Sequence, residues 1–163
     1  MIVVDTNAII SLGFCDLSLN LLENFDVHTT EVVIEELEDI MEYDDKKGKI
    51  AEIILHNDDK ITIHDVREEG SFKHRRIDKG GGSCVILARK IKADFLVTDD
   101  VRALPYLKNI SMTKVVLSPI VLKALVHKDA LGEKEAKEKL IKLIENRDWL
   151  ETPIYERSLE LFD

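Results

Sequence analysis

The chain has 163 residues and a mass of 18.6 kDa, which is the size of a single domain. Its composition, 45% hydrophobic and 34% charged, excludes an intrinsically disordered chain. The formal net charge of −9 argues against a protein that binds nucleic acid passively through a basic surface. It does not exclude an enzyme that meets nucleic acid through a local basic patch and bound cations.

Targeting signals and cysteine usage favour a cytoplasmic protein. No uncharged apolar run approaches the roughly 18 residues that a membrane span needs, so we expect no membrane association. The opening segment has no basic region and reaches Asp5 too early for a secretory signal. Cys15 and Cys84 lie far apart and fit no metal-binding spacing, which predicts two reduced thiols.

Short apolar segments alternate with helical patterns along the chain. Strands are predicted at residues 2–4, 25–28, 61–66, 93–98 and 115–117. Helices are predicted at residues 8–24, 31–43, 46–56, 84–92, 101–108, 120–127, 134–145 and 155–162. This alternation is typical of an α/β protein with a parallel sheet of about four or five strands and helices on both faces. We expect one domain over residues 1–163, in which residues 128–163 form a helical C-terminal extension.

Two of the predicted strands end in aspartate. Asp5 follows the first strand, and Asp99 and Asp100 follow the fourth. In open parallel sheets, ligands bind beyond the carboxyl ends of the strands, so these carboxylates should share one edge. An aspartate at such a position is also a common helix N-cap, and for a single residue the two interpretations are about equally good. Two such strand ends in one small sheet favour a functional site.

The acidic helix predicted over residues 31–43 offers a further carboxylate. At about 100° per residue, its apolar residues form one face, and Glu31, Glu35 and Glu42 point into solvent. Glu36 and Glu38 lie at the flanks of the apolar face, where a side chain can reach the edge of the sheet. We therefore expect Glu36 to join the strand-end aspartates.

Clustered carboxylates repel one another unless they share a proton or hold a divalent cation. A site made only of oxygen ligands suits Mg²⁺ or Mn²⁺, whose usual chemistry is phosphodiester hydrolysis. The sequence has no zinc spacing and no Ser-His-Asp order, and the glycine run at residues 80–82 lacks the lysine of a phosphate-binding P-loop. A phosphotransferase of the haloacid-dehalogenase type is disfavoured, because Asn7 stands where that class needs a second aspartate.

Three motifs resemble those of the PIN domain, a family of metal-dependent ribonucleases. They are Ile-Val-Val-Asp-Thr-Asn at residues 2–7, Thr-Thr-Glu-Val-Val-Ile-Glu-Glu-Leu at residues 29–37, and Val-Thr-Asp-Asp at residues 97–100. The resemblance covers most of the chain and implies a three-layer α/β fold. It implies catalytic roles for Asp5, Glu36 and Asp100, and a Mg²⁺ or Mn²⁺ site held by these three residues with Asp99.

The resemblance fails at the start of the helix that follows the glycine run. The family usually carries an acidic residue there, and the alignment places it at Gly81, with a second near Ser83. Asp78 would reach the site only if the glycines bend the chain. Two functions are therefore expected: a metal-dependent endoribonuclease, or a catalytically weakened PIN-like domain that binds RNA or a protein.

Basic residues precede the glycine run, and we expect Lys73, Arg75 and Arg76 to bind RNA phosphates beside the metal site. An ordinary solvated loop is an equally good interpretation of these residues. The resemblance leaves open a toxin with an antitoxin-like protein partner and an RNA-processing nuclease. We also expect a homodimer.

Overall fold

A computed structural model describes residues 1–69 and 75–163. In this part of the chain, five parallel strands form one sheet in the order β3-β2-β1-β4-β5. The strands are β1 (Ile2–Val4), β2 (Val27–Thr30), β3 (Ile61–His64), β4 (Phe95–Val97) and β5 (Lys114–Val116). The predicted α/β fold with a parallel sheet is confirmed.

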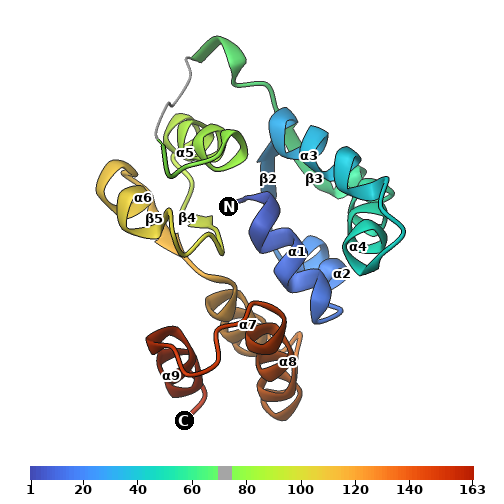
Figure 1. The fold of residues 1–163 in the computed structure, drawn as a ribbon, viewed down its shortest axis with the longest axis vertical. Coiled ribbons are helices and arrows are strands. Elements are labelled where there is room, and N and C mark those ends of the chain that lie inside the picture. The colour runs from blue at the N-terminus through green and yellow to red at the C-terminus, as the bar shows by residue number, and fades with distance from the viewer. Residues whose placement is uncertain (70–74) are drawn as a thin grey trace.

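Helices cover both sides of this sheet. The first four are α1 (Thr6–Phe14), α2 (Ser18–Asn24), α3 (Glu31–Met41) and α4 (Lys46–Leu55). The others are α5 (Lys79–Lys90), α6 (Leu104–Ile110), α7 (Ser118–His127), α8 (Glu133–Asn146) and α9 (Pro153–Glu160). Because crossovers between parallel strands are right-handed, the return of the chain from β3 to β4 carries α5 to the face opposite α1. Figure 1 shows these two helices on opposite sides of the strands.

The helical segment predicted over residues 8–24 forms two helices, α1 and α2. Asp16, with a φ of 58°, adopts the left-handed conformation at the break. The amide of Leu17 closes the turn by donating to the carbonyl of Leu12. Aspartate tolerates this conformation better than most residues, so Asp16 is a local signal for the break that the apolar pattern hides.

The glycine run lies within a helix, although the helix predicted in this region covered only residues 84–92. Gly80, Gly81 and Gly82 lie inside the first turns of α5, which begins at Lys79 after its N-cap Asp78. Neither Gly80 nor Gly81 has a positive φ, so backbone strain does not explain why glycine stands there. A 3₁₀-helix at Arg67–Glu69 precedes residues 70–74, which lie outside the described part of the chain.

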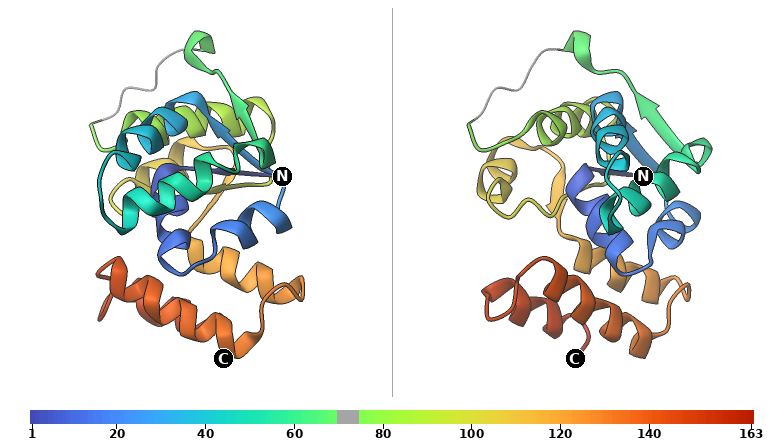
Figure 2. Two further views of the ribbon diagram at one scale, coloured as in Figure 1. Left: turned by 90° about the vertical axis from the view of Figure 1, so that its right-hand side faces the viewer. Right: turned by 45° about the vertical axis from the view of Figure 1, so that its right-hand side comes forward.

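The C-terminal helices form a lower layer in Figures 1 and 2. α8 packs against α1 and α7, and α9 packs against α8. The side chain of Lys139 ties α8 to the end of α1 by donating to the carbonyl of Cys15 at 2.9 Å. Buried apolar residues of α8, including Leu140, Leu143 and Ile144, join the same core as the strands.

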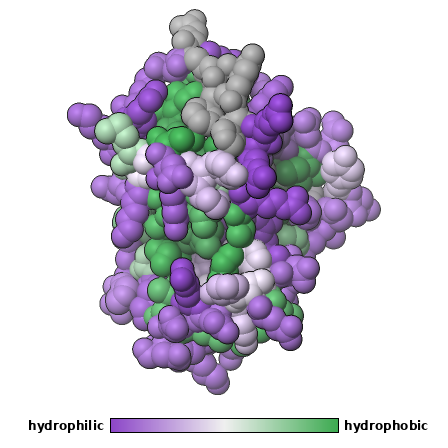
Figure 3. All heavy atoms as spheres, turned by 60° about the vertical axis from the view of Figure 1, so that its left-hand side comes forward, coloured by the Kyte–Doolittle hydropathy of each residue, from purple (hydrophilic) through white to green (hydrophobic). Residues whose placement is uncertain are grey.

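One face of the molecule carries an apolar groove. A cavity of about 320 Å³ lies between α6, β5, α7 and α9, and its lining includes Leu104, Val115, Ile120 and Ile154. Figure 3, turned to bring the α6 side of Figure 1 forward, shows apolar residues gathered on this face. In the described residues, no helix is long and apolar enough to cross a membrane.

Candidate active site

Asp5 lies at the carboxyl end of β1, in the middle of the sheet. Its backbone amide donates to the carbonyl of Val97 at 3.1 Å, which continues the pairing of β1 with β4. Its carboxylate accepts the amide of Ala8 at 2.8 Å and so caps α1. The side chain is 3% exposed. Asp5 is therefore both a helix cap and a buried carboxylate, and the capping bond accounts for one of its two oxygens.

Asp99 and Asp100, the two aspartates that follow β4, make different hydrogen bonds. Both carboxylate oxygens of Asp99 accept bonds from Ser118, one from the amide at 2.8 Å and one from the hydroxyl at 2.6 Å. Asp99 therefore joins the end of β4 to the start of α7. Asp100 uses a single oxygen, Oδ1, to accept the amides of Arg102 and Ala103, both at 3.1 Å. Its half-buried carboxylate also lines a pocket at this edge.

Glu36 reaches the same edge from the second turn of α3. Thr30, at the end of β2, caps α3 by accepting the amide of Val33, which fixes where the helix begins. The hydroxyl of Thr6 donates to Oε2 of Glu36. Since Thr6 directly follows Asp5, this contact brings the Glu36 carboxylate to the end of β1.

The Glu36 carboxylate lies against the backbone of Gly80. A β-carbon built on Gly80 would stand 2.5 Å from Oε2 and 2.7 Å from Oε1 of Glu36. These distances are shorter than van der Waals contact, so the carboxylate occupies space that any other residue at position 80 would fill. At Gly81, a β-carbon would instead face Asp78, 3.1 Å from its Oδ1. Gly80 rather than Gly81 therefore shapes the surroundings of Glu36.

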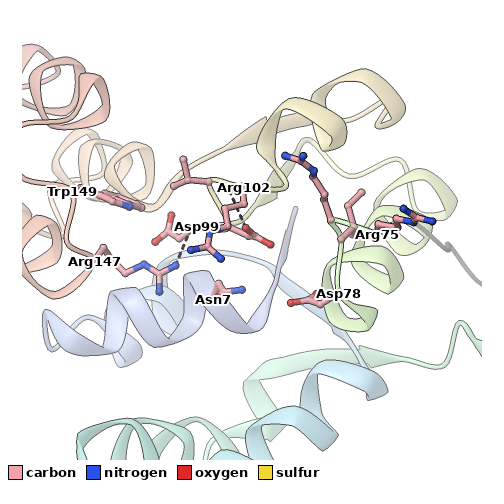
Figure 4. A pocket seen from close by; sticks show the side chains of 11 residues that line it. Asn7, Arg75, Asp78, Asp99, Arg102, Arg147 and Trp149 are labelled. Atoms are coloured by element: carbon pink, nitrogen blue, oxygen red, sulfur yellow. Dashed lines mark hydrogen bonds between the residues drawn. The ribbon is translucent and has the colours of Figure 1, made fainter.

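Asp78 brings another carboxylate to this edge. Its Oδ1 accepts the amide of Gly81 at 2.7 Å, so Asp78 is the N-cap of α5. Figure 4 shows its side chain directed toward Asn7 across the pocket. The family motifs give Asp78 no role, and it reaches the site by capping a regular helix rather than through a bend in the glycine run. An aspartate placed directly before an apolar helix is the sequence signal for such a cap.

Burial and mutual repulsion dominate the electrostatics of these carboxylates. Burial raises the pKa of Asp5 to about 7, against hydrogen bonds from Thr98 and Ala8, and the negative charges of Asp99 and Asp78 raise it further. Burial also raises the pKa of Glu36, which the bond from Thr6 lowers and the charge of Asp78 raises. The site therefore concentrates negative charge that a bound cation would neutralise.

The cations around the pocket come from separate parts of the chain. The cavity is about 800 Å³, and its lining includes Asn7, Asp78 and Asp100 together with four arginines, Arg75, Arg76, Arg102 and Arg147. In Figure 4, Arg75 lies on the α5 side of the pocket and points away from Asp99. Arg102 and Arg147 point into the pocket. Lys73, also predicted to bind RNA, lies outside the described residues.

The oxygen donors are of the type that Mg²⁺ and Mn²⁺ prefer. Within residues 1–69 and 75–163, however, no three His, Cys, Asp or Glu side chains stand close enough together to hold a metal ion as they lie. The donor set fits a divalent cation in chemical type and in charge.

Comparison with known families decides the class of this fold. A model of the PIN domain matches residues 1–163, which is the whole chain. The chain belongs to the PIN-domain family. No curated protein and no solved structure matches it.

This membership places the chain in a nuclease superfamily whose members generally use divalent metal ions and bind RNA. The edge that gathers Asp5, Glu36, Asp78 and Asp100 is the carboxyl edge of the sheet, where parallel α/β folds bind their ligands. In this PIN domain, glycine stands at positions 80 and 81, near the place where the family usually carries an acid. The carboxylate of Glu36 lies next to Gly80, and the carboxylate of Asp78 lies next to Gly81.

Proposed function

We propose that this PIN domain is a metal-dependent endoribonuclease that hydrolyses RNA phosphodiester bonds at the carboxyl edge of its sheet. The observation that carries this proposal is the Asp5 carboxylate, 3% exposed at the carboxyl end of β1, on the edge where Asp78 and Asp100 line an open pocket. A buried carboxylate in such surroundings is stabilised by a cation. Helix N-termini at the same edge add partial positive charge, which favours an anionic phosphate.

We assign the cation to Asp5, Glu36 and Asp100, with Asp78 as the fourth carboxylate. A bound Mg²⁺ or Mn²⁺ would lower the pKa of a water molecule and offset charge on the phosphate oxygens. The chain's own residues do the positioning: the Thr6 hydroxyl holds the Glu36 carboxylate at the end of β1. Asp99, which we also expected to be a ligand, holds α7 through Ser118 and so fixes the strand end from which Asp100 projects.

The second candidate is a PIN domain that binds RNA or a protein without cleaving it. The observation that favours it is the pair of glycines at positions 80 and 81, which leaves the site without a carboxylate on the first turn of α5. Fewer ligand charges weaken the binding of a hard divalent cation.

One experiment separates the two candidates. Purified protein is incubated with a labelled single-stranded RNA in Mn²⁺, in Mg²⁺ and in EDTA, and Asp5→Asn serves as the matched control. Cleavage that needs the cation and is lost in Asp5→Asn supports the nuclease. RNA that stays intact in every condition supports the non-cleaving module.

Identifying a protein partner would distinguish a toxin from an RNA-processing nuclease. We propose that residues 1–163 act as a single unit in the cytoplasm, consistent with the two buried free thiols Cys15 and Cys84. An antitoxin-like protein partner and a homodimer remain predictions. A small reading frame beside the gene, whose product copurifies with the protein, would support the toxin role, and light scattering would give the oligomeric state.

A further inference from the structure

The C-terminal helices contribute to the pocket at the carboxylate edge. Arg147 follows the last residue of α8 and lies far from the family motifs in sequence, yet it lines the pocket with Asp99 and Asp100. Its Nη2 donates to the backbone carbonyl of Asp99 at 2.9 Å. The extension therefore brings a permanent positive charge to the strand end that carries the site.

The guanidinium of Arg147 is held in a defined orientation. It lies over the ring of Trp149 at 5.8 Å from the ring centre, and Trp149 itself is only 6% exposed. A guanidinium carries five N–H donors in a planar fork, and the bond to Asp99 uses one of them. A fixed planar fork beside an open pocket suits the paired oxygens of a phosphate better than the mobile charge of a lysine.

Arg102 adds a second cation on the same side. It follows Asp100 by two residues, and its backbone amide donates to the carboxylate of Asp100. Figure 4 shows Arg102 and Arg147 directed into the pocket from the side opposite Asp78 and Arg75. The pocket thus has arginines and carboxylates on both of its sides, in a cavity of about 800 Å³ that has room for more than one phosphate.

We propose that Arg102 and Arg147 form the second wall of a groove for the RNA backbone and bind phosphates on the side of the carboxylates opposite Arg75 and Arg76. This inference rests on the proposed function for the choice of RNA as the ligand. It goes beyond that function by giving the C-terminal extension a direct contact with the substrate. An RNA strand that crosses the site would have phosphates bound on both sides of the carboxylates. These contacts would place the phosphodiester bond that lies between the bound phosphates at the carboxylates.

A role for Arg147 in structure alone is the main competing explanation, since its bond to Asp99 also fastens the extension to the sheet. Arg147→Gln separates the two roles, because glutamine can still donate to the Asp99 carbonyl but carries no charge. Lys134→Gln, at an exposed position of α8, removes the same charge far from the pocket and serves as the matched control.

The test measures the binding of a short fluorescein-labelled single-stranded RNA by anisotropy, in EDTA so that no metal-dependent cleavage occurs, over a series of KCl concentrations. Each lost phosphate contact lowers the slope of log Kd against log salt by about 0.7. We expect Arg147→Gln and Arg102→Gln each to weaken binding several-fold at low salt and to lower the slope by about this amount. Lys134→Gln should leave the slope unchanged.

Three results would overturn the inference. They are wild-type protein that does not bind this RNA, weaker binding of Arg147→Gln with an unchanged slope, and displacement of the RNA by an acidic peptide at equal charge concentration. The last result would assign the arginines to protein carboxylates. A different result would contradict the nuclease function alone: RNA would bind with the expected salt slopes but would stay intact in Mn²⁺.

Discussion

The Glu36 carboxylate occupies the space that a β-carbon of Gly80 would fill. The two residues come from α3 and α5, which pack side by side at the carboxyl edge of the sheet. The hydroxyl of Thr6 and the backbone of Gly80 both hydrogen-bond this carboxylate. A glycine in the first turn of a helix normally lowers helix stability relative to alanine, so its presence here is explained by the position of Glu36.

Gly80→Ala should therefore separate stability from function. Alanine favours helix by up to about 1 kcal/mol, and the atoms it meets are the mobile end of Glu36, so thermal stability should change little. The displaced carboxylate should lose its bond to Thr6, and Mn²⁺ affinity should fall at least several-fold. Calorimetric titration of Mn²⁺ and a thermal melt check both parts.

Gly81→Ala is the matched control for this prediction. A β-carbon there stands 3.1 Å from Oδ1 of Asp78 and more than 4 Å from Glu36, so Mn²⁺ affinity should stay close to that of the wild type. Gly81→Asp would place a carboxylate beside Asp78, the fourth carboxylate of the proposed site, so it should bind Mn²⁺ more tightly than Gly81→Ala does. Equal Mn²⁺ affinities for Gly81→Asp and Gly81→Ala would contradict this geometry.

The raised pKa of Asp5 predicts a stability that depends on pH. The pKa is 3.8 for an ordinary aspartate and about 7 in the folded protein. Between these values the folded protein keeps a proton that the unfolded chain has lost, so the free energy of unfolding falls as pH rises from about 4 to about 7. Asp5→Asn has no such proton to lose and keeps an oxygen that can accept the amide of Ala8.

Asp5→Asn should therefore gain stability over the wild type as pH rises through this window, by up to about 4 kcal/mol. Urea unfolding of both proteins in EDTA, at about pH 5 and about pH 8, measures the difference. A difference that is the same at both pH values would show that Asp5 titrates near its ordinary pKa.

Mn²⁺ should raise the melting temperature of the wild-type protein. A cation that binds only the folded state raises the free energy of unfolding by RT ln(1 + c/Kd), where c is the concentration of free Mn²⁺, and it also relieves the repulsion around Asp5. Asp5→Asn and Asp78→Asn should each lose most of this shift. Asp26→Asn, which changes an exposed aspartate just before β2, should keep it. Equal shifts in all four proteins would place the cation elsewhere.

Asp99 and Asp100 should respond differently to substitution although they are neighbours. Asp99→Ala removes both bonds to Ser118 at the buried start of α7, which should cost about 1–3 kcal/mol of folding free energy. Asp100→Asn keeps an oxygen for the amides of Arg102 and Ala103, so its stability should stay within about 0.5 kcal/mol of the wild type. Its RNA cleavage should nevertheless fall strongly.

Chemical denaturation and a cleavage assay on the same samples test this contrast. Ser118→Ala provides the control for the first half, since it removes only the hydroxyl bond and should cost less than Asp99→Ala. A large loss of stability in Asp100→Asn, or full cleavage activity in that variant, would reverse the assignments of the two aspartates.

The amino-acid sequence by itself determined the class of fold and the edge at which the carboxylates gather. Short β-branched segments alternating with amphipathic helices specify a parallel sheet, and aspartates directly after two strands must lie at its carboxyl edge. The angle of Glu36 on its helix also follows from local periodicity. These features depend on residues that are a few positions apart in the sequence, so the local pattern of apolar and polar residues is enough to predict them.

Only the tertiary structure decided how these side chains divide their roles. The space for Glu36 beside Gly80, the bonds of Asp99 to Ser118 and the approach of Arg147 to Asp99 join residues 44, 19 and 48 positions apart, respectively. Such contacts arise when helices pack, and no local period records them. The sequence therefore predicts where the site lies, whereas packing selects which carboxylate supports the fold and which one faces the pocket.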